Sequence, residues 1–389
     1  MKNLILSALA LSGLCLGGQA QEEIAPQMQY AEAVASTDFA VDMFRSLAQR
    51  MQGNLIYSPA GIEAVLNLLK QGARGNTAAE LNSLPLGQQA ALSALNPDEA
   101  EALFLAKSLA LNPSIKADSV YTVPFESNPT EAAQQINDWA SLHTNGRIPA
   151  IVSANGLSPL TRLVAANAIY LQEKWLHPFN KISTQPNTMF TKADGSIELV
   201  DMMYNRDEYI YAEGEDWQAV AMFYDTMGRM GEPGCFIGIL PKGNAREFAR
   251  SLTPYKYRTI LQALVMSSEH DTIVRLPRFE FTTAPFSLVP ALRACGLNDL
   301  FTPAADFSGF CNEPLYLSDV LQRCYVKTDE EGTEAAAATA TAVMMIICSA
   351  AAPPPSRPRE INFNRPFIWV IGNLNVNATP YFMGITEEP

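Results

Sequence analysis

Histidine is scarce in this sequence, since only His143, His177 and His270 occur among 389 residues. None of them lies in an HExxH pattern, and the chain has no GxSxG motif, glycine-rich phosphate loop or dense carboxylate cluster. We therefore expect surface or packing histidines rather than catalytic bases. The acidic run Asp329-Glu330-Glu331 could be taken for an acid site, but we interpret it as a solvated segment. The sequence predicts a protein that is not an enzyme.

Cysteine is also scarce, and its spacing forms no pattern. The chain has six cysteines, and five remain once the N-terminal segment that contains Cys15 is removed. Their odd number and wide separation, without a CxxC pair, argue against a disulfide framework and a metal site. Most are expected to be small buried hydrophobic residues, whereas Cys348 lies in a loop. The five are Cys235, Cys295, Cys311, Cys324 and Cys348. We expect no metal and no other cofactor.

Positively charged residues are also fewer than negatively charged ones. Lys and Arg number 27 against 40 Asp and Glu, which gives a net charge of −13, or −14 once Lys2 is removed with the leader. An acidic chain without a basic patch argues against nucleic acid and anionic membranes as partners.

Long hydrophobic runs are confined to the N-terminus. Lys2 is followed by the apolar stretch Leu4–Leu16 and by Gly18-Gln19-Ala20, a small-x-small cleavage site. This pattern predicts a signal peptide over residues 1–20 and a secreted or periplasmic protein, with a leader of bacterial type. Lipid attachment at Cys15 is the alternative, although Leu14 is larger than a lipoprotein peptidase usually accepts. No later run is long enough to span a bilayer.

The most unusual stretch that is present is Glu330–Ser349, which reads EEGTEAAAATATAVMMIICS. Ala335–Ala338 favour a helix, whereas Thr339, Thr341 and Val343 favour a strand. As a strand it would span about 45 Å at about 3.3 Å per residue. Gly332 precedes it and leaves the backbone free to bend. The segment suits an exposed loop in one state and a strand in another; a low-complexity Ala/Thr linker is the alternative.

In the strand state the two faces of this segment differ. Alternation places small or β-branched residues without charge on one face, which could enter a packed sheet without burying an unpaired charge. These residues are Thr333, Ala335, Ala337, Thr339, Thr341 and Val343. The other face, which begins at Glu334, suits solvent.

The run from Glu330 to Thr339 resembles the hinge of the serpins, where two acidic residues precede Gly-Thr-Glu and an alanine run. It matches that pattern at every position. The hinge residues are Glu330, Glu331, Gly332, Thr333, Glu334, Ala335, Ala336, Ala337 and Ala338. NLIYSPAGI at 54–62, INDWASLHTNGRIPAIV and LTRLVAANAIYLQEKWLHPF within 136–179, and the closing strand patterns also resemble the family. The similarity extends from about residue 30 to 387.

The resemblance implies an α+β serpin fold with about three β-sheets, surrounding helices and an exposed reactive-centre loop at about 330–360. No linker or repeat divides the interior, so residues 21–389 are expected to form one domain. Helical patterns cover 27–52, 60–71, 132–144, 246–267 and 288–294, and Thr77 could cap a further helix. Strand patterns cover 54–58, 163–171, 198–203, 219–224, 235–240, 272–279, 315–327, 365–370 and 381–384.

The resemblance also implies a suicide-substrate inhibitor that forms an acyl complex with a serine or cysteine protease and inserts its cut loop into the main sheet. Family spacing places the reactive bond between Ile346 and Ile347, with Met345 or the Cys348-Ser349 bond as alternatives. These apolar or uncharged residues suit proteases with hydrophobic or small pockets, such as elastase-like enzymes. The segment Ala350–Glu360, with its three prolines, is longer than usual in the family, which leaves the exact bond open.

In the region that opens to admit the loop, Ser58, Asn167 and Trp175 match the family pattern. Gly61 replaces a serine and Gln322 replaces a histidine, but a Gln side chain can still donate and accept hydrogen bonds. Trp175 could equally be a plain core residue. The expected protein is a monomer, and two other function classes stay open. One is a non-inhibitory serpin acting as a chaperone or binding module, and the other is an exported peptidase.

Overall fold

The computed structural model describes residues 24–84, 86, 94–113, 115, 117–283, 286–333 and 357–389. Its α-helices are α1 (Ile24–Arg50), α2 (Pro59–Lys70), α3 (Gly75–Ser83), α4 (Pro129–His143), α5 (Ala245–Ser251), α6 (Pro254–Val265) and α7 (Val289–Ala294). Its strands are β1 (Leu55–Tyr57), β2 (Asp98–Ala106), β3 (Val120–Val123), β4 (Leu163–Tyr170), β5 (Glu173–Lys174), β6 (Gln185–Thr191), β7 (Ile197–Glu213), β8 (Trp217–Phe223), β9 (Gly234–Pro241), β10 (Glu269–Pro277), β11 (Phe279–Thr282), β12 (Phe286–Ser287), β13 (Asp319–Thr328), β14 (Gly332–Thr333), β15 (Arg359–Asn362), β16 (Phe367–Asn373) and β17 (Phe382–Thr386).

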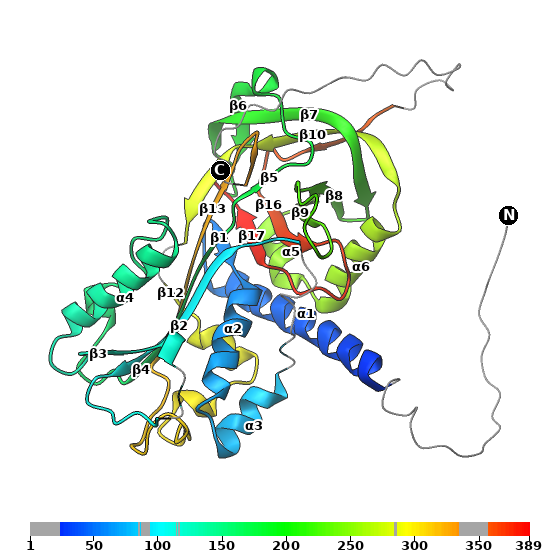
Figure 1. Cartoon of the computed structure of the whole chain (residues 1–389). Coiled ribbons are helices and arrows are strands. Elements are labelled where there is room, and N and C mark those ends of the chain that lie inside the picture. The colour runs from blue at the N-terminus through cyan, green and yellow to red at the C-terminus, as the bar shows by residue number, and fades with distance from the viewer. Residues whose placement is uncertain are drawn as a thin grey trace, which may run out of the picture.

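The main sheet has eight strands, with β4 and β13 at its centre. The order β3-β2-β4-β13-β14-β5 is completed by β11 and β12, which pair with β13. All residues of β4 are buried, as a nearly continuous apolar strand predicts for a sheet covered on both faces. Helix α4 contacts β2, β3 and β4 from one side, while α2 contacts β2 and β4 from the other (Figure 1).

The second sheet has nine strands in the order β1-β17-β16-β9-β8-β7-β10-β15, and β6 pairs with β7. Strand β7 joins its two halves, because one end pairs with β8 and the rest pairs with β6 and β10. The described residues therefore form two hydrogen-bonded sheets where the resemblance implied about three, because β7 joins strands that would otherwise belong to separate sheets. An aromatic and aliphatic cluster, which includes Phe236 and Trp369, packs these strands against β4 and β13.

Two sequence predictions about elements were wrong. The single helix expected over 246–267 is two helices, because Pro254 begins α6 and the Thr253 hydroxyl caps it. Thr77 does not cap α3. It lies inside the helix, where its hydroxyl donates to Asp299 at 3.0 Å and accepts from the Asp306 N–H at 2.8 Å. The other expected helices and strands occur at or near their predicted positions, although β7 is far longer than the stretch 198–203.

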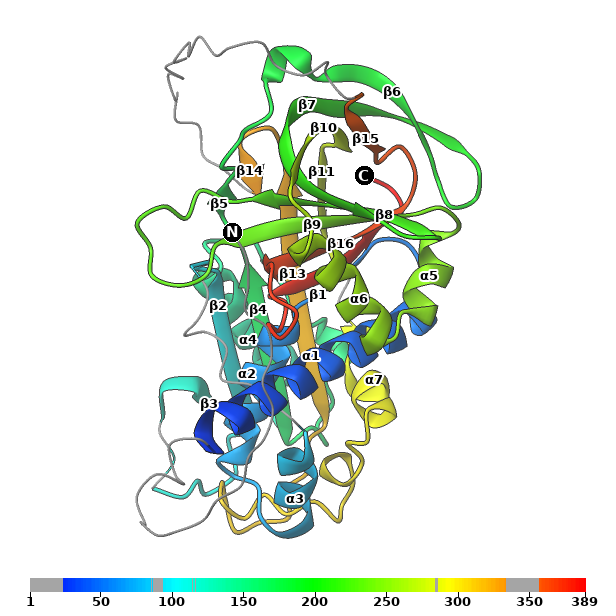
Figure 2. The ribbon, with the colours of Figure 1, turned by 90° about the vertical axis from the view of Figure 1, so that its right-hand side faces the viewer.

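Strands β14 and β15, which flank residues 334–356 in the chain, both lie at the upper end of the molecule in Figure 2. Helices α3 and α7 lie toward the opposite end. Strands β4 and β13 run between the two ends, so the main sheet leads from the hinge toward the opposite pole.

Candidate functional site

Two residues of the hinge form a short strand of the main sheet. Gly332 and Thr333 make up β14, which pairs antiparallel with β13 on one side and with β5 on the other. Thr333 is 1% exposed, and its hydroxyl lies 2.7 Å from the Tyr224 hydroxyl. At Gly332 a Cβ atom would lie 2.1 Å from the carbonyl oxygen of Glu173, so this close approach requires glycine.

Trp175 holds the turn that leads into β14. Its indole N–H donates to the Asp329 carbonyl and its backbone N–H donates to the Glu331 carbonyl, both at 2.9 Å. The indole stacks on Tyr224 with the ring centroids 4.8 Å apart. Trp175 is buried, as a core tryptophan would be, but its hydrogen bonds bind it to the hinge and not only to the core.

Glu330 is buried, which corrects the expectation of a solvated acidic run. Only 2% of its side chain is exposed, and both carboxylate oxygens accept hydrogen bonds from Arg278 at 2.7 to 2.9 Å. Thr184 donates to the same carboxylate, and the Phe179 N–H donates to the Glu330 carbonyl. Burial alone would raise the pKa of Glu330, but the hydrogen bonds from Arg278 and Thr184 outweigh it and hold the pKa below its usual value.

Three residues predicted for the opening region form one network at the seam between β4 and β13: Asn167 lies on β4, Gln322 lies on β13, and Ser58 caps α2. The Gln322 amide accepts from the Ser58 N–H and donates to the Ser58 carbonyl, both at 2.9 Å, and it also donates to the Asn167 side-chain oxygen at 3.0 Å. All three residues are buried. Gly61 is part of this fit, because a Cβ atom there would lie 2.2 Å from the same Asn167 oxygen. Gln322 therefore bonds to both Ser58 and Asn167, and the space that Gly61 leaves is filled by the Asn167 side chain.

Glu99 on β2 extends this network toward the edge of the sheet. The Asn167 side-chain N–H₂ donates to the Glu99 carboxylate at 3.4 Å and to the Ala100 carbonyl at 3.3 Å. Burial, followed by repulsion from Glu101, raises the pKa of Glu99 to about 7. A carboxyl group that titrates near neutral pH thus adjoins the seam.

The comparisons with known proteins agree on one family. The model of the serpin family, serine protease inhibitors, matches residues 34–389. The chain belongs to the serpin family. A serpin-like protein of Thermococcus kodakarensis is 33% identical over 382 residues, covering 91% of this chain and 85% of the relative. Plasminogen activator inhibitor 1 of Bos taurus is 28% identical, with 99% of each chain covered. The relatives named here are archaeal and mammalian, so a bacterial source stays a prediction.

Solved serpin structures share the fold. Manduca sexta serpin-12 has a TM-score of 0.73 at 25% identity and covers 91% of this chain and 98% of its own. Native protease nexin-1 with heparin has a TM-score of 0.76 at 22% identity, which bears on the fold alone. The predictions of a serpin and of an α+β serpin fold are confirmed. Members of this family are mostly protease inhibitors.

Several predicted site residues of this serpin lie outside the described residues. These are hinge residues Glu334, Ala335, Ala336, Ala337 and Ala338, the reactive-bond candidates Met345, Ile346, Ile347, Cys348 and Ser349, and Cys15 with its leader. Within the described ranges, none of the helices is long and apolar enough to cross a membrane.

Sequence reasoning missed the partners that anchor the hinge. Arg278 and Thr184 reach Glu330 from β10–β11 and from the segment before β6, and no spacing in the sequence links them. Glu173, 3% exposed beside β14, is paired with Arg229 from the β8–β9 connection and was also missed. A buried carboxylate needs a cation, but the sequence was interpreted as placing Glu330 in solvent and so gave no reason to look for one.

Two of the three histidines have a polar partner in the described residues. His177 contacts Asp207 at 3.0 Å, and His143 lies 2.8 Å from the Trp139 carbonyl. Over the described part of the chain, no group of three His, Cys, Asp or Glu side chains could hold a metal ion.

Proposed function

We propose that this serpin is a suicide-substrate inhibitor of serine proteases, or of cysteine proteases, with hydrophobic or small-residue specificity. One observation carries the proposal: Gly332 and Thr333 already lie as a strand between β13 and β5. The hinge therefore points into the main sheet at the place where further residues would have to enter. The family's usual activity and the intact hinge sequence support the same function.

Insertion would replace the direct pairing between β4 and β13 by the pairing of each strand with a new strand between them. Strands β4 and β13 pair in parallel from Val164 with Asp319 to Tyr170 with Tyr325. An inserted strand that continues β14 would be antiparallel to both, and antiparallel pairing is slightly more stable per residue. Continuing the register of β14 brings Thr339 opposite Asn167 on β4 and Gln322 on β13. The hydrogen bond between those two side chains would then have to open.

The chemical step follows from cleavage of the loop as a substrate. The protease hydroxyl or thiol attacks the carbonyl carbon of the residue before the cut, Ile346 in the preferred assignment. The peptide C–N bond breaks, the new amine of Ile347 takes a proton and leaves, and an ester or thioester remains. Insertion then carries the protease away before water can hydrolyse that bond. In this scheme the chain itself turns over no substrate, and it acts as a monomer.

The composition of the loop supports the specificity. Residues 335–356 contain no Lys or Arg, so a trypsin-like pocket, which carries an acidic residue, finds no matching side chain there. Arg357 precedes Pro358, which disfavours cleavage. We also infer that residues 1–20 are removed on export, leaving residues 21–389 as one domain, or that Cys15 is lipid-modified instead.

The test is to incubate the mature chain with neutrophil elastase, chymotrypsin, subtilisin, papain and trypsin, followed by denaturing gels and mass spectra of the released peptide. A stable covalent band is expected with at least one of the first four proteases, and the peptide mass chooses among Met345, Ile346 and Cys348. Clean cleavage by every protease without a complex would favour the non-inhibitory alternative, a serpin that acts as a chaperone or binding module.

Two variants make this test specific for insertion. Ala335→Glu places a charge on the inward face of the inserted strand, whereas Ala336→Glu places the same charge on the outward face. The first should be cleaved without forming a complex, and the second should still inhibit. Equal inhibition by both variants would contradict the insertion mechanism.

A further inference from the structure

A row of polar side chains crosses three strands of the main sheet at the seam. Glu101 on β2, Asn167 on β4 and Gln322 on β13 are direct neighbours in the register of these strands. Side chains at alternate positions of a strand share a face, so Glu99 lies on the same face of β2 as Glu101. On this side of the sheet α2 packs on β2 and β4, and β1 lies against β13. Two carboxylates therefore lie next to the contact that insertion would have to open.

Glu99 has one polar partner there and no cation. The Asn167 amide that donates to it at 3.4 Å also donates to the Ala100 carbonyl at 3.3 Å, so this single donor is shared. Besides burial, the like charge of Glu101 raises the pKa of Glu99, and no Lys, Arg or His of the described residues offsets it. The titratable groups on this side of the sheet are Glu101 on β2, Glu63 and Lys70 on α2, Tyr57 on β1 and Cys324 on β13.

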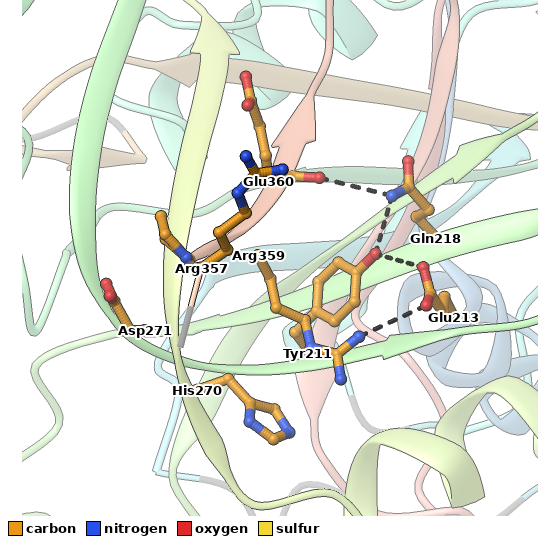
Figure 3. A pocket seen from close by; sticks show the side chains of 9 residues that line it. Tyr211, Glu213, Gln218, His270, Asp271, Arg357, Arg359 and Glu360 are labelled. Carbon is orange, nitrogen blue, oxygen red and sulfur yellow. Dashed lines mark hydrogen bonds and ion pairs between the residues drawn. The ribbon is translucent and has the colours of Figure 1, made fainter. Parts of the chain in front are cut away.

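The carboxylates of the groove beside β15 show the more usual arrangement. Glu213 accepts a hydrogen bond from the Tyr211 hydroxyl at 2.9 Å and lies 3.4 Å from Arg359 (Figure 3). Its charge is exposed and has a cation beside it, whereas the charge of Glu99 is largely removed from water and has none. An ionised carboxylate in the second situation destabilises the closed structure that buries it.

Parting of β4 from β13 would relieve the charge on Glu99. The hydrogen bond from Gln322 to Asn167 breaks when the two strands separate, which leaves the Asn167 amide free to turn toward Glu99. Water also gains access to the edge of β4. An ionised carboxylate gains more from a donor and from water than a neutral carboxyl group does.

We propose that Glu99 sets the rate at which the main sheet opens: its ionised form favours the parting of β4 from β13, and its protonated form keeps the seam closed. This inference rests on the proposed insertion, because it assigns a controlling residue to that step. Glu99 touches neither the protease nor the reactive bond, so it is a positioning residue that acts through Asn167. The closed sheet holds the proton more tightly than the opening sheet, so the rate rises with pH and levels off above about pH 7.

The test is the initial rate at which the mature chain takes up a labelled peptide of residues 333–346, capped at both ends, between about pH 5.5 and 8. The unchanged chain should take up the peptide about tenfold faster at pH 8, which corresponds to one pKa unit recovered as the sheet opens. Glu99→Gln, which is neutral and of the same size, should be slow at every pH. Glu213→Gln removes the partnered carboxylate on the other sheet and should keep the full dependence on pH. The same peptide is used throughout, so its own titration affects all chains equally.

Glu101→Gln gives an independent measurement that does not require the Glu99→Gln chain to fold. It removes the neighbouring like charge, so the rise in rate should remain but move to lower pH. A purely structural role would instead change the rate equally at every pH. Peptide uptake that does not depend on pH, a rise that persists in Glu99→Gln, or an unshifted rise in Glu101→Gln would overturn this inference and leave insertion standing. Absence of uptake at every pH would contradict insertion itself, and this inference with it.

Discussion

At the scale of single residues, Glu330 has the most demanding environment in the hinge. Its carboxylate is buried and depends on Arg278 and Thr184. Arg278→Ala should lower the free energy of unfolding at pH 7 by about 2 to 3 kcal/mol, because a buried charge loses its partner. Arg206→Ala, which breaks the exposed pair with Asp271, is the matched control and should cost under about 1 kcal/mol. Urea unfolding measures both losses, and equal losses would contradict the assignment.

The pH dependence of the Arg278→Ala effect has a definite sign. The pKa of Glu330 is lowered in the folded chain, so its stabilisation is present above the unfolded pKa and is lost as the pH falls. The difference between the unchanged chain and Arg278→Ala should therefore shrink toward acid pH.

For Glu99 we predict the opposite dependence of stability on pH. Its pKa is raised to about 7 in the folded chain, so the folded state binds a proton that the unfolded state has lost between about pH 4.5 and 7. Stability from this residue is present at low pH and falls as the pH rises through that window. Glu99→Gln should raise the free energy of unfolding by about 1 to 3 kcal/mol at pH 8 and leave it nearly unchanged at pH 4. The exposed Glu208→Gln variant is the control. A higher free energy of unfolding for Glu99→Gln at pH 4 would contradict the prediction.

At the scale of elements, the contact between β4 and β13 would have to part for the proposed insertion. Gln322→Leu removes an amide of similar size that bonds to Asn167 across the seam and to Ser58 at the start of α2. Three buried polar atoms would lose a partner, at about 1 to 3 kcal/mol each before relaxation. The variant should take up a synthetic peptide of residues 333–346 faster than the unchanged chain, as followed by native gels. Gln134→Leu on the exposed side of α4 serves as the control, and equal uptake rates would be the contradicting outcome.

Most elements could be predicted because their patterns are local. The fully apolar run of β4 and the buried face of α2 follow from periodicity, and the two residues Asn145 and Gly146, both with positive φ, form the expected turn. Pro254 was also visible in the sequence, and a proline is favoured at the first position of a helix, but the prediction of one helix over 246–267 did not use it. The extent of β7 could not be predicted, because its pairing with β6, β8 and β10 is set by tertiary contacts.

The site could be predicted only in part for a similar reason. The sequence pointed to Ser58, Asn167 and Gln322, and the structure brings these three together, whereas Trp175 lies at the hinge. The ion pair of Arg278 with Glu330 joins positions 52 residues apart, and no periodicity encodes such a contact. A charged residue in a polar run is expected to be solvated unless the fold supplies a partner.

At the scale of the whole molecule, the proposed insertion makes the intact chain less stable than its cleaved form. The native state would be held by the barrier to opening the sheet and not by its depth in free energy. A single cut within residues 334–356 should therefore raise the midpoint of thermal unfolding by tens of degrees, as measured by calorimetry. A cut chain that melts at or below the intact one would show that the loop does not insert.

The short strand β14 has one more consequence, for the rate and accuracy of that transition. A free strand would need to search for its partners, and the loss of chain entropy on closing the first contact is the slow part of such a search. Here β14 is already paired with β13 and β5 in the uncut chain, so the proposed insertion would need growth but no nucleation. The same contact also fixes the phase of side-chain alternation, because a slip of one residue would turn Glu334 into the interior in place of Thr333. The outcome of cleavage would then depend on whether strand growth is faster than hydrolysis of the acyl bond, and growth would begin from a contact that exists before cleavage.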